Sequence, residues 1–138
     1  MKYRRKKIFV TENKTKYVWC YLYKKNTDLN DFYKKYCERR GMKWARVAGV
    51  SIHFTNKFIE TGKVTPLTGV VLLSMDRMGA GIVAHEFTHA CFWAYKHNLR
   101  KRQYPLVIKN MIEEEKILHG QFEAVRSFWK WYYKIEKE

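Results

Sequence analysis

Residues 83–91 read VAHEFTHAC, and the interpretation of the whole sequence depends on this stretch. If the stretch lies on a helix, His85 and His89 stand one turn apart and project from the same face. Two imidazole nitrogens placed in this way are close enough to bind one zinc ion. Glu86 then sits beside the metal, where it can accept a proton from a zinc-bound water that attacks a peptide carbonyl. The spacing therefore predicts a metal site with a general base.

The flanking residues favour a helix from about Met78 to His97. Asp76 is placed to cap its N-terminus, and the sequence GAG at 79–81 indicates close packing at that end. Apolar side chains keep a helical rhythm around the motif, at Ile82, Phe87, Ala90, Ala94 and Leu99. The alternative interpretation is that two surface histidines flank a glutamate on a solvated helix face.

Before this helix, the chain contains several short runs of β-forming residues bounded by turn residues. The strands predicted from these runs are Ile8–Val10, Tyr17–Tyr23, Trp44–Phe54 and Val70–Met75. His53 alternates with Ile52 and Phe54, so it is interpreted as an ordinary strand residue.

Two more helices are predicted. One covers Asp28–Arg40, with Thr27 or Asp28 as its N-cap and Gly41 as its C-terminal stop. The other is a long final helix from about Val107 to Lys134. Its expected apolar stripe includes Leu118, Phe122, Val125 and Trp129. We therefore expect one α+β domain over residues 1–138, a short antiparallel or mixed sheet packed on the motif helix and the final helix.

Composition limits the partners and the location. The chain has 28 Lys and Arg against 13 Asp and Glu, a formal net charge of +15. Such an excess favours polyanionic partners such as nucleic acid, although a basic solvated surface also explains it. The three cysteines form no CxxC pair, which fits a cytoplasmic protein without a disulfide framework. No apolar run approaches the roughly 18 residues that a membrane span needs, so no membrane association is expected.

A catalytic zinc needs a third protein ligand and an open position for water. No histidine falls at the third-ligand spacing of the compact HExxHxxGxxH pattern. Counting back along the apolar stripe from Trp129 to Leu118 leads to Glu115, so this carboxylate is expected to point inward toward a metal. Glu114, beside the stripe, and His119, one turn beyond Glu115, are the alternatives. Acidic residues are also common at helix N-termini for electrostatic reasons alone.

VAHEFTHA at 83–90, followed by EEEKIL at 113–118, resembles the zincin metallopeptidases. The glutamate on a later helix looks like the gluzincin group, which includes small phage and bacterial proteins with the same order of elements. The resemblance covers about residues 68–132. It implies that His85, His89 and Glu115 bind Zn²⁺ and that Glu86 is the general base. It also implies that the strand before the motif, Gly69–Met75, is an edge strand that pairs with an extended substrate.

The SprT-like DNA-associated proteases, a second zincin branch, are similar in a different way, because they carry a third histidine in an HG pair. This chain has His119 followed by Gly120, and its positive charge also suits a DNA-associated protein. However, 29 residues separate His89 from His119, more than is usual in that family, and no cysteine zinc ribbon follows. The glutamate version is therefore preferred.

Two functions from different classes follow from these patterns. The first is a cytoplasmic, zinc-dependent metallopeptidase that hydrolyses a protein or peptide substrate. The second is a basic nucleic-acid-binding or regulatory protein on a zincin scaffold. Its support is the basic clusters Arg4–Lys7 and Arg100–Arg102 together with Tyr3, Tyr104 and Trp131, which can stack on bases. Both are compatible with a protease that acts on DNA-bound proteins.

Overall fold

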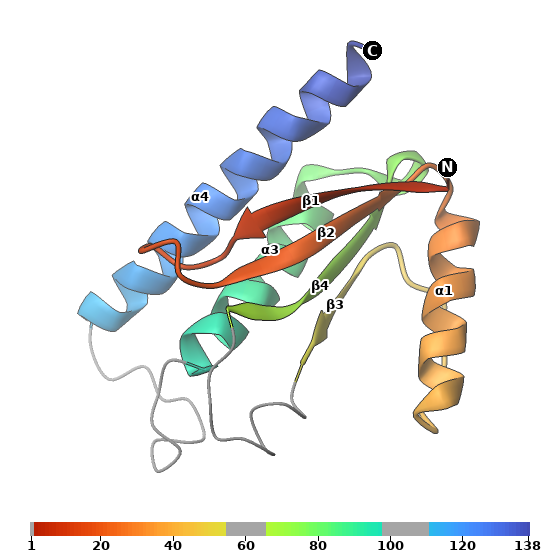
Figure 1. The fold of residues 1–138 in the computed structure, drawn as a ribbon, viewed down its shortest axis with the longest axis horizontal. Coiled ribbons are helices and arrows are strands. Elements are labelled where there is room, and N and C mark those ends of the chain that lie inside the picture. The colour runs from red at the N-terminus through yellow and green to blue at the C-terminus, as the bar shows by residue number, and fades with distance from the viewer. Residues whose placement is uncertain (1, 55–65, 98–110) are drawn as a thin grey trace.

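A computed structural model describes residues 2–54, 66–97 and 111–138 (Figure 1). In these ranges the chain forms a four-stranded mixed sheet and three α-helices, which confirms the α+β class. The strands are β1 (Tyr3–Phe9), β2 (Tyr17–Tyr23), β3 (Val50–His53) and β4 (Leu67–Ser74). The helices are α1 (Asn26–Arg39), α3 (Ala80–His97) and α4 (Met111–Glu136), and a 3-10 turn, η1 (Met75–Arg77), precedes α3.

The strand order in the sheet is β1-β2-β4-β3. β2 and β4 are parallel, whereas β1 pairs with β2 and β3 pairs with β4 in antiparallel fashion. The strand before the motif helix is therefore internal, and the expectation that Gly69–Met75 forms an edge is wrong. The physical reason is that β4 is apolar on both faces, which suits a strand that is covered on both sides and bonded to two neighbours.

The predicted strand Tyr17–Tyr23 is confirmed as β2, but its neighbours differ in length from the prediction. β1 begins at Tyr3, so the basic cluster at 4–7 belongs to the strand and pairs with β2. β3 is shorter than Trp44–Phe54 because α1 holds the residues before it. Asn30 Nδ2 donates to the Val47 carbonyl, and the Val47 amide donates back to Asn30 Oδ1, both at 2.9 Å.

The caps of α1 are partly as predicted. Its C-terminal end matches the prediction, because Gly41 has a positive φ of 66° and the next amide, that of Met42, donates to the Cys37 carbonyl at 2.9 Å. Its N-terminus begins at Asn26, so Thr27 and Asp28 lie inside the helix. Asp76 accepts the Asn26 amide at 2.8 Å, so it caps α1, and the prediction that Asp76 caps the motif helix is wrong.

The core lies mainly on one face of the sheet, where α3 and α4 pack (Figure 1). Its buried members include Ile8, Val18, Leu22, Val71 and Leu73 from the sheet and Val83, Phe87, Ala94, Ala124 and Phe128 from the helices. α1 packs on the opposite face, where Leu29 contacts a smaller cluster with Tyr23, Ile52 and Leu72. The sheet is therefore covered by α3 and α4 on one face and contacted by α1 on the other.

The buried stripe of α4 differs from the predicted stripe in the earlier turns of the helix. Ile117, Ala124, Phe128 and Tyr132 are buried. Leu118 and Phe122, which were expected inside, are 48% and 60% exposed. Val125 and Trp129, two other members of the predicted stripe, do pack against the core. The error therefore concerns the earlier turns, where one residue corresponds to a rotation of about 100° around the helix. The predicted start at Val107 lies outside the described residues.

Substitution of Gly69 tests the close approach of the β3 backbone to β4. A Cβ atom at Gly69 would overlap the Ile52 carbonyl oxygen, which belongs to the backbone and cannot move aside alone. Gly69→Ala is therefore expected to destabilise the protein by about 1–3 kcal/mol in urea unfolding. The control is Gly81→Ala, at the start of α3, where an added Cβ meets nothing within 4 Å. A Gly69→Ala variant as stable as the control would contradict this packing.

Candidate metal centre

The apolar face of α3 determines where the motif residues point. Val83, Phe87, Ala90 and Ala94 are buried against the sheet and α4. Because a helix turns about 100° per residue, burying these positions sends His85 to the opposite side. Its side chain is 68% exposed, and His89 is also exposed. Glu86 lies between the buried and the exposed side of α3, and it is 6% exposed.

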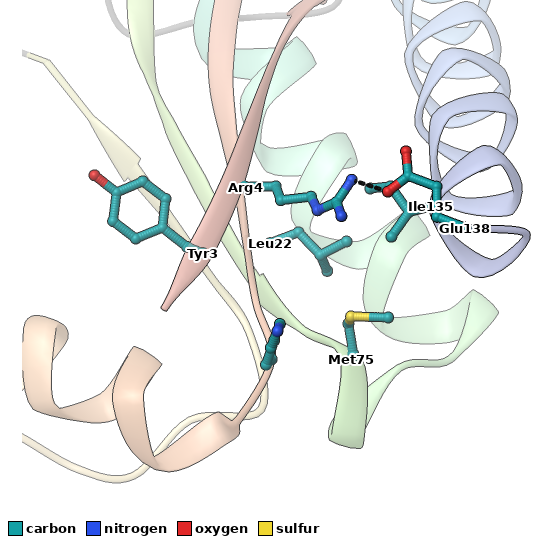
Figure 2. Close-up of a pocket in the computed structure, with 7 residues that line it drawn as sticks. Tyr3, Arg4, Leu22, Met75, Ile135 and Glu138 are labelled. Carbon is teal, nitrogen blue, oxygen red and sulfur yellow. Dashed lines mark ion pairs between the residues drawn. The ribbon is translucent and has the colours of Figure 1, made fainter. Parts of the chain in front are cut away.

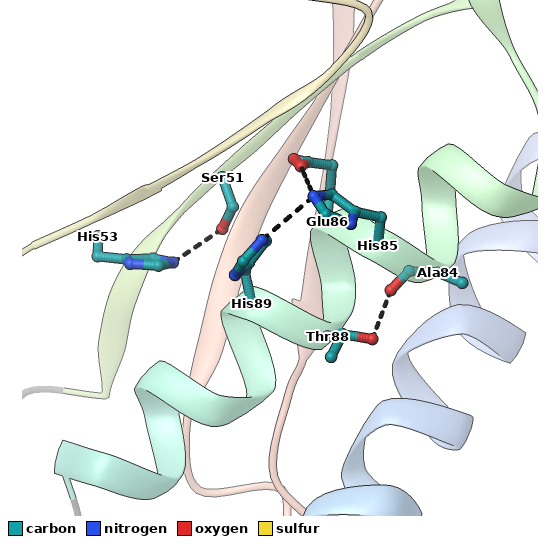
Figure 3. A network of polar contacts seen from close by, with 7 residues as sticks. All are labelled: Ser51, His53, Ala84, His85, Glu86, Thr88 and His89. Carbon is teal, nitrogen blue, oxygen red and sulfur yellow. Dashed lines mark hydrogen bonds and ion pairs between the residues drawn. The ribbon is translucent and has the colours of Figure 1, made fainter. Parts of the chain in front are cut away.

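His85 and His89 converge at their Nε2 atoms, which lie 3.2 Å apart (Figure 3). The ring planes are nearly perpendicular, at 85°. Two nitrogens bound tetrahedrally to zinc at 2.0–2.1 Å would lie about 3.4 Å apart, so the observed separation suits a shared ion. It also suits a hydrogen bond between two neutral imidazoles, which is the alternative without a metal. His85, Glu86 and His89 form a group whose ligand atoms all lie within 4.8 Å, so the group could hold a metal ion.

Glu86 contributes a buried carboxylate to this group. Its Oε1 lies 3.7 Å from His85 Nε2, and its Oε2 is buried without a hydrogen-bond partner among the described residues. Burial raises the pKa of Glu86, while His85 and His89 lower it by a smaller amount. A buried carboxylate oxygen without a partner is unfavourable, and a cation or a water molecule held by a cation would supply one.

β3 lies beside the histidine side of α3. Ser51 and His53 reach toward α3 (Figure 3), and Ser51 Oγ lies 3.1 Å from His53 Nε2. His53 also stacks on Trp93, with the ring centroids 5.0 Å apart. Trp93 is one turn beyond His89 on the same side of α3. His53 is therefore close to the candidate site, whereas its sequence pattern alone indicated only an ordinary strand residue.

The three candidates for the third ligand lie apart from this group. Glu114 and Glu115 are exposed, and Glu115 Oε2 lies 3.5 Å from His119 Nε2 in a pair that is more than 60% exposed on both sides. The expectation that Glu115 points inward is wrong, because the buried stripe of α4 passes through Ile117. α4 instead approaches α3 through Gln121, whose Nε2 lies 3.5 Å from Thr88 Oγ1. The ligand role of Glu115 stays a prediction.

The cavity shown in Figure 2 is separate from the candidate site. It has a volume of about 540 Å³, and β1, β2, η1 and the end of α4 line it. Arg4 and Glu138 form an ion pair across one side. None of the motif residues contributes to this cavity. The candidate metal centre lies on the surface of α3, where His85 and His89 are exposed.

In comparisons with known proteins, no family model, no curated protein and no solved structure matches the chain. The family resemblance of the motif thus depends on the residues themselves. Within the described residues, no helix is both long enough and apolar enough to cross a membrane.

The raised pKa of Glu86 predicts a pH dependence of stability for the protein without metal. Because folding raises this pKa above 4.5, the folded state holds the proton more tightly. The contribution of Glu86 to stability is present below pH 4.5 and is lost as the pH rises through the raised value. Glu86→Gln should therefore gain stability relative to the natural chain as the pH increases from 4 to 7, measured by urea unfolding with a chelator present. Glu123→Gln, at an exposed position, is the control for the loss of one carboxylate.

Proposed function

We propose that this protein is a zinc-dependent metallopeptidase. The observation that carries the proposal is the placement of two imidazole Nε2 atoms 3.2 Å apart beside a buried carboxylate with an unpartnered oxygen. Solvated helix faces rarely bury a carboxylate in this way, because the desolvation is unfavourable without a partner. Two imidazoles that can share one ion, with a carboxylate beside them, are groups that hydrolytic zinc sites use.

His85 and His89 would hold the ion through their Nε2 atoms. Bound zinc supplies a Lewis acid that polarises a carbonyl and lowers the pKa of water. Glu86 accepts the proton of the attacking water and returns it to the leaving amine. The burial that raises the pKa of Glu86 suits this exchange, because a group that both takes and gives a proton works best with a pKa near the working pH.

The substrate would lie along β3, which takes the role that the zincin resemblance implied for residues 69–75. β3 is the outer strand of the described sheet on this side, and it pairs only with β4. An extended peptide can add to such an edge through backbone hydrogen bonds. Ser51 and His53 face α3 from this strand, so they would contact the residues next to the scissile bond.

The third ligand is proposed to come from the first turns of α4. Glu115 is the first choice, with Glu114 and His119 as alternatives. The exposed pair between Glu115 and His119 is worth only about 0–1 kcal/mol, so exchanging it for a metal bond opposes binding little. Metal sites commonly gain their final ligand geometry when the ion binds, because binding and folding are coupled.

Substitution of Glu86 distinguishes metal binding from hydrolysis. Glu86→Gln should keep zinc bound, while hydrolysis of an unstructured protein such as casein falls by about 10²–10⁴-fold, since the general base is lost. His89→Ala should lose zinc as well, as measured by metal analysis after dialysis against a chelator buffer. Thr88→Ala, which changes the neighbouring residue outside the cluster, is the control for both measurements. Equal hydrolysis by Glu86→Gln and the natural chain would disprove the proposed mechanism.

The third ligand can be identified by its effect on zinc affinity. Glu115→Ala is expected to weaken zinc binding at least tenfold in a competition titration, because one of three protein ligands is removed. Glu123→Ala, an exposed carboxylate further along α4, should leave the affinity unchanged. If Glu114→Ala or His119→Ala weakens binding and Glu115→Ala does not, the ligand assignment is wrong. If none of the three variants does, the ligand does not come from this turn of α4.

A further inference from the structure

The face of the sheet opposite α3 carries an unusual row of side chains on β1 and β2. The register of the two strands places their odd-numbered residues on one face. These residues are Tyr3, Arg5, Lys7 and Phe9 on β1 and Tyr17, Trp19, Tyr21 and Tyr23 on β2. Six of the eight are aromatic, two are cationic, and neither strand contains an acidic residue. We call these eight residues the aromatic face.

Most of the aromatic face is uncovered in the part of the chain that the structure describes. α1 contacts this side of the sheet through Leu29, next to Tyr23. Toward β1, Tyr3 is 40% exposed and Phe9 is 36% exposed. Arg5 and Lys7 are also exposed, and the β2 rings from Tyr17 to Tyr21 are half-buried. A large apolar patch that stays accessible marks an interaction site.

The cations lie on the rings of the aromatic face. The Arg5 guanidinium is 4.6 Å from the centroid of the Trp19 ring, and the Lys7 ammonium is 4.2 Å from that of Tyr17. Cation–π contact holds these charges close to the ring surface, where both are available to one ligand. A ligand that lies on this face would therefore meet aromatic rings and positive charge together.

We propose that the aromatic face binds single-stranded nucleic acid. Stacking of bases on aromatic side chains, combined with cations that neutralise phosphates, is the way in which proteins hold single strands without sequence preference. Successive residues on one face of a strand are about 6–7 Å apart, twice the spacing of about 3.4 Å along one strand of a duplex. The rings thus suit separated, unstacked bases, and a paired duplex offers no free base faces to them.

A pocket continues the aromatic face toward α1. It has a volume of about 320 Å³, and its lining includes Tyr3, Tyr21, Phe32 and Tyr36. Arg40 lies over the ring of Tyr36, one of the lining residues, at 4.6 Å, which repeats the combination of cation and ring. This volume is within the range of small-molecule sites, so the pocket can receive a single flipped base at the end of the bound strand. An acidic peptide would pair with the charges but would leave these ring faces unused.

The site is independent of the proposed peptidase centre, because it lies on the other face of the sheet. Together the two sites would place a single strand on one side of the protein and a peptide on the other. The net charge of +15 then has a function beyond solubility, since it attracts the strand over a distance.

Adjacent lysines on β1 provide a matched pair for the test. Lys7 belongs to the aromatic face, whereas Lys6 points to the other face of the same strand, and both are exposed. Lys7→Glu and Lys6→Glu change the net charge equally. Trp19→Leu removes the largest ring but keeps an apolar side chain, and Phe122→Leu on α4 is its aromatic control. Circular dichroism and urea unfolding of each variant show whether it is folded.

The experiment is fluorescence anisotropy of the full chain with labelled oligonucleotides of about 20 nucleotides, a length that spans more than one site of this kind. Oligo-dT and oligo-U distinguish DNA from RNA, and a duplex of the same length and polyglutamate are the comparison ligands. We expect a single strand to bind at least tenfold more tightly than the duplex or polyglutamate. Trp19→Leu should weaken binding at least fivefold, and Lys7→Glu should weaken it and reduce the slope of log affinity against log salt by about one to two.

Three outcomes would overturn the proposal: no binding of either single strand, equal binding of the duplex or polyglutamate, or equal weakening by Lys6→Glu and Lys7→Glu. The last result would mean that the positive charge acts diffusely and that the aromatic face is not the site. Glu86→Gln should bind the strand as the natural chain does, so failure of the peptidase proposal and failure of this one are distinguishable.

Discussion

The burial of one face of α3 is the constraint on which the candidate site depends. Val83, Phe87 and Ala94 must face the core, and a helix allows no independent choice of direction for the residues between them. His85 and His89 are consequently presented together at the surface, one turn apart. Glu86, next in sequence to His85, is rotated toward the boundary of the core and becomes buried. Packing of an apolar stripe thus produces the separation of exposed imidazoles and buried carboxylate on which the proposed zinc site is based.

The sheet extends this arrangement in two directions. On the side of α3, the outer strand β3 brings Ser51 and His53 beside the helix, where the ring of His53 stacks on Trp93. On the opposite side, the same period-two alternation places the rings and cations of β1 and β2 on one face. Cys20 and Leu22 bury the alternate positions of β2 in the core, so Trp19 and Tyr21 necessarily face the other way. The same sheet therefore positions both proposed sites, one on each of its faces.

The sequence predicted elements well where a local pattern dominates and less well where tertiary contacts decide. The motif helix, β2 and the Gly41 end of α1 follow from apolar spacing and turn chemistry, and the structure confirms them. The length of β3 depends on Asn30, which binds the backbone at Val47. Asp76 caps α1 rather than α3, because the fold brings η1 to the start of α1. No local pattern contains either of these long-range contacts.

The candidate site shows the same limit. The pairing of His85 with His89 is a consequence of helix geometry, so spacing alone was sufficient to predict it. The direction of Glu115 depended on the phase of the α4 stripe, in which both Leu118 and Ile117 were apolar options, and a difference of one residue reversed the conclusion. Proximity of His53 to the motif helix requires the packing of separate elements, which no single segment encodes.

X-ray absorption at the zinc edge is the measurement that tests the central claim most directly, because it reports the atoms around the ion. For the full chain loaded with one equivalent of zinc, the account predicts nitrogen and oxygen neighbours at about 2.0–2.1 Å, with the outer-shell signature of two imidazole rings. Replacing either His85 or His89 should reduce that signature to one ring. A zinc environment without imidazole scattering would contradict the account. So would the signature of two rings in a variant that lacks both histidines.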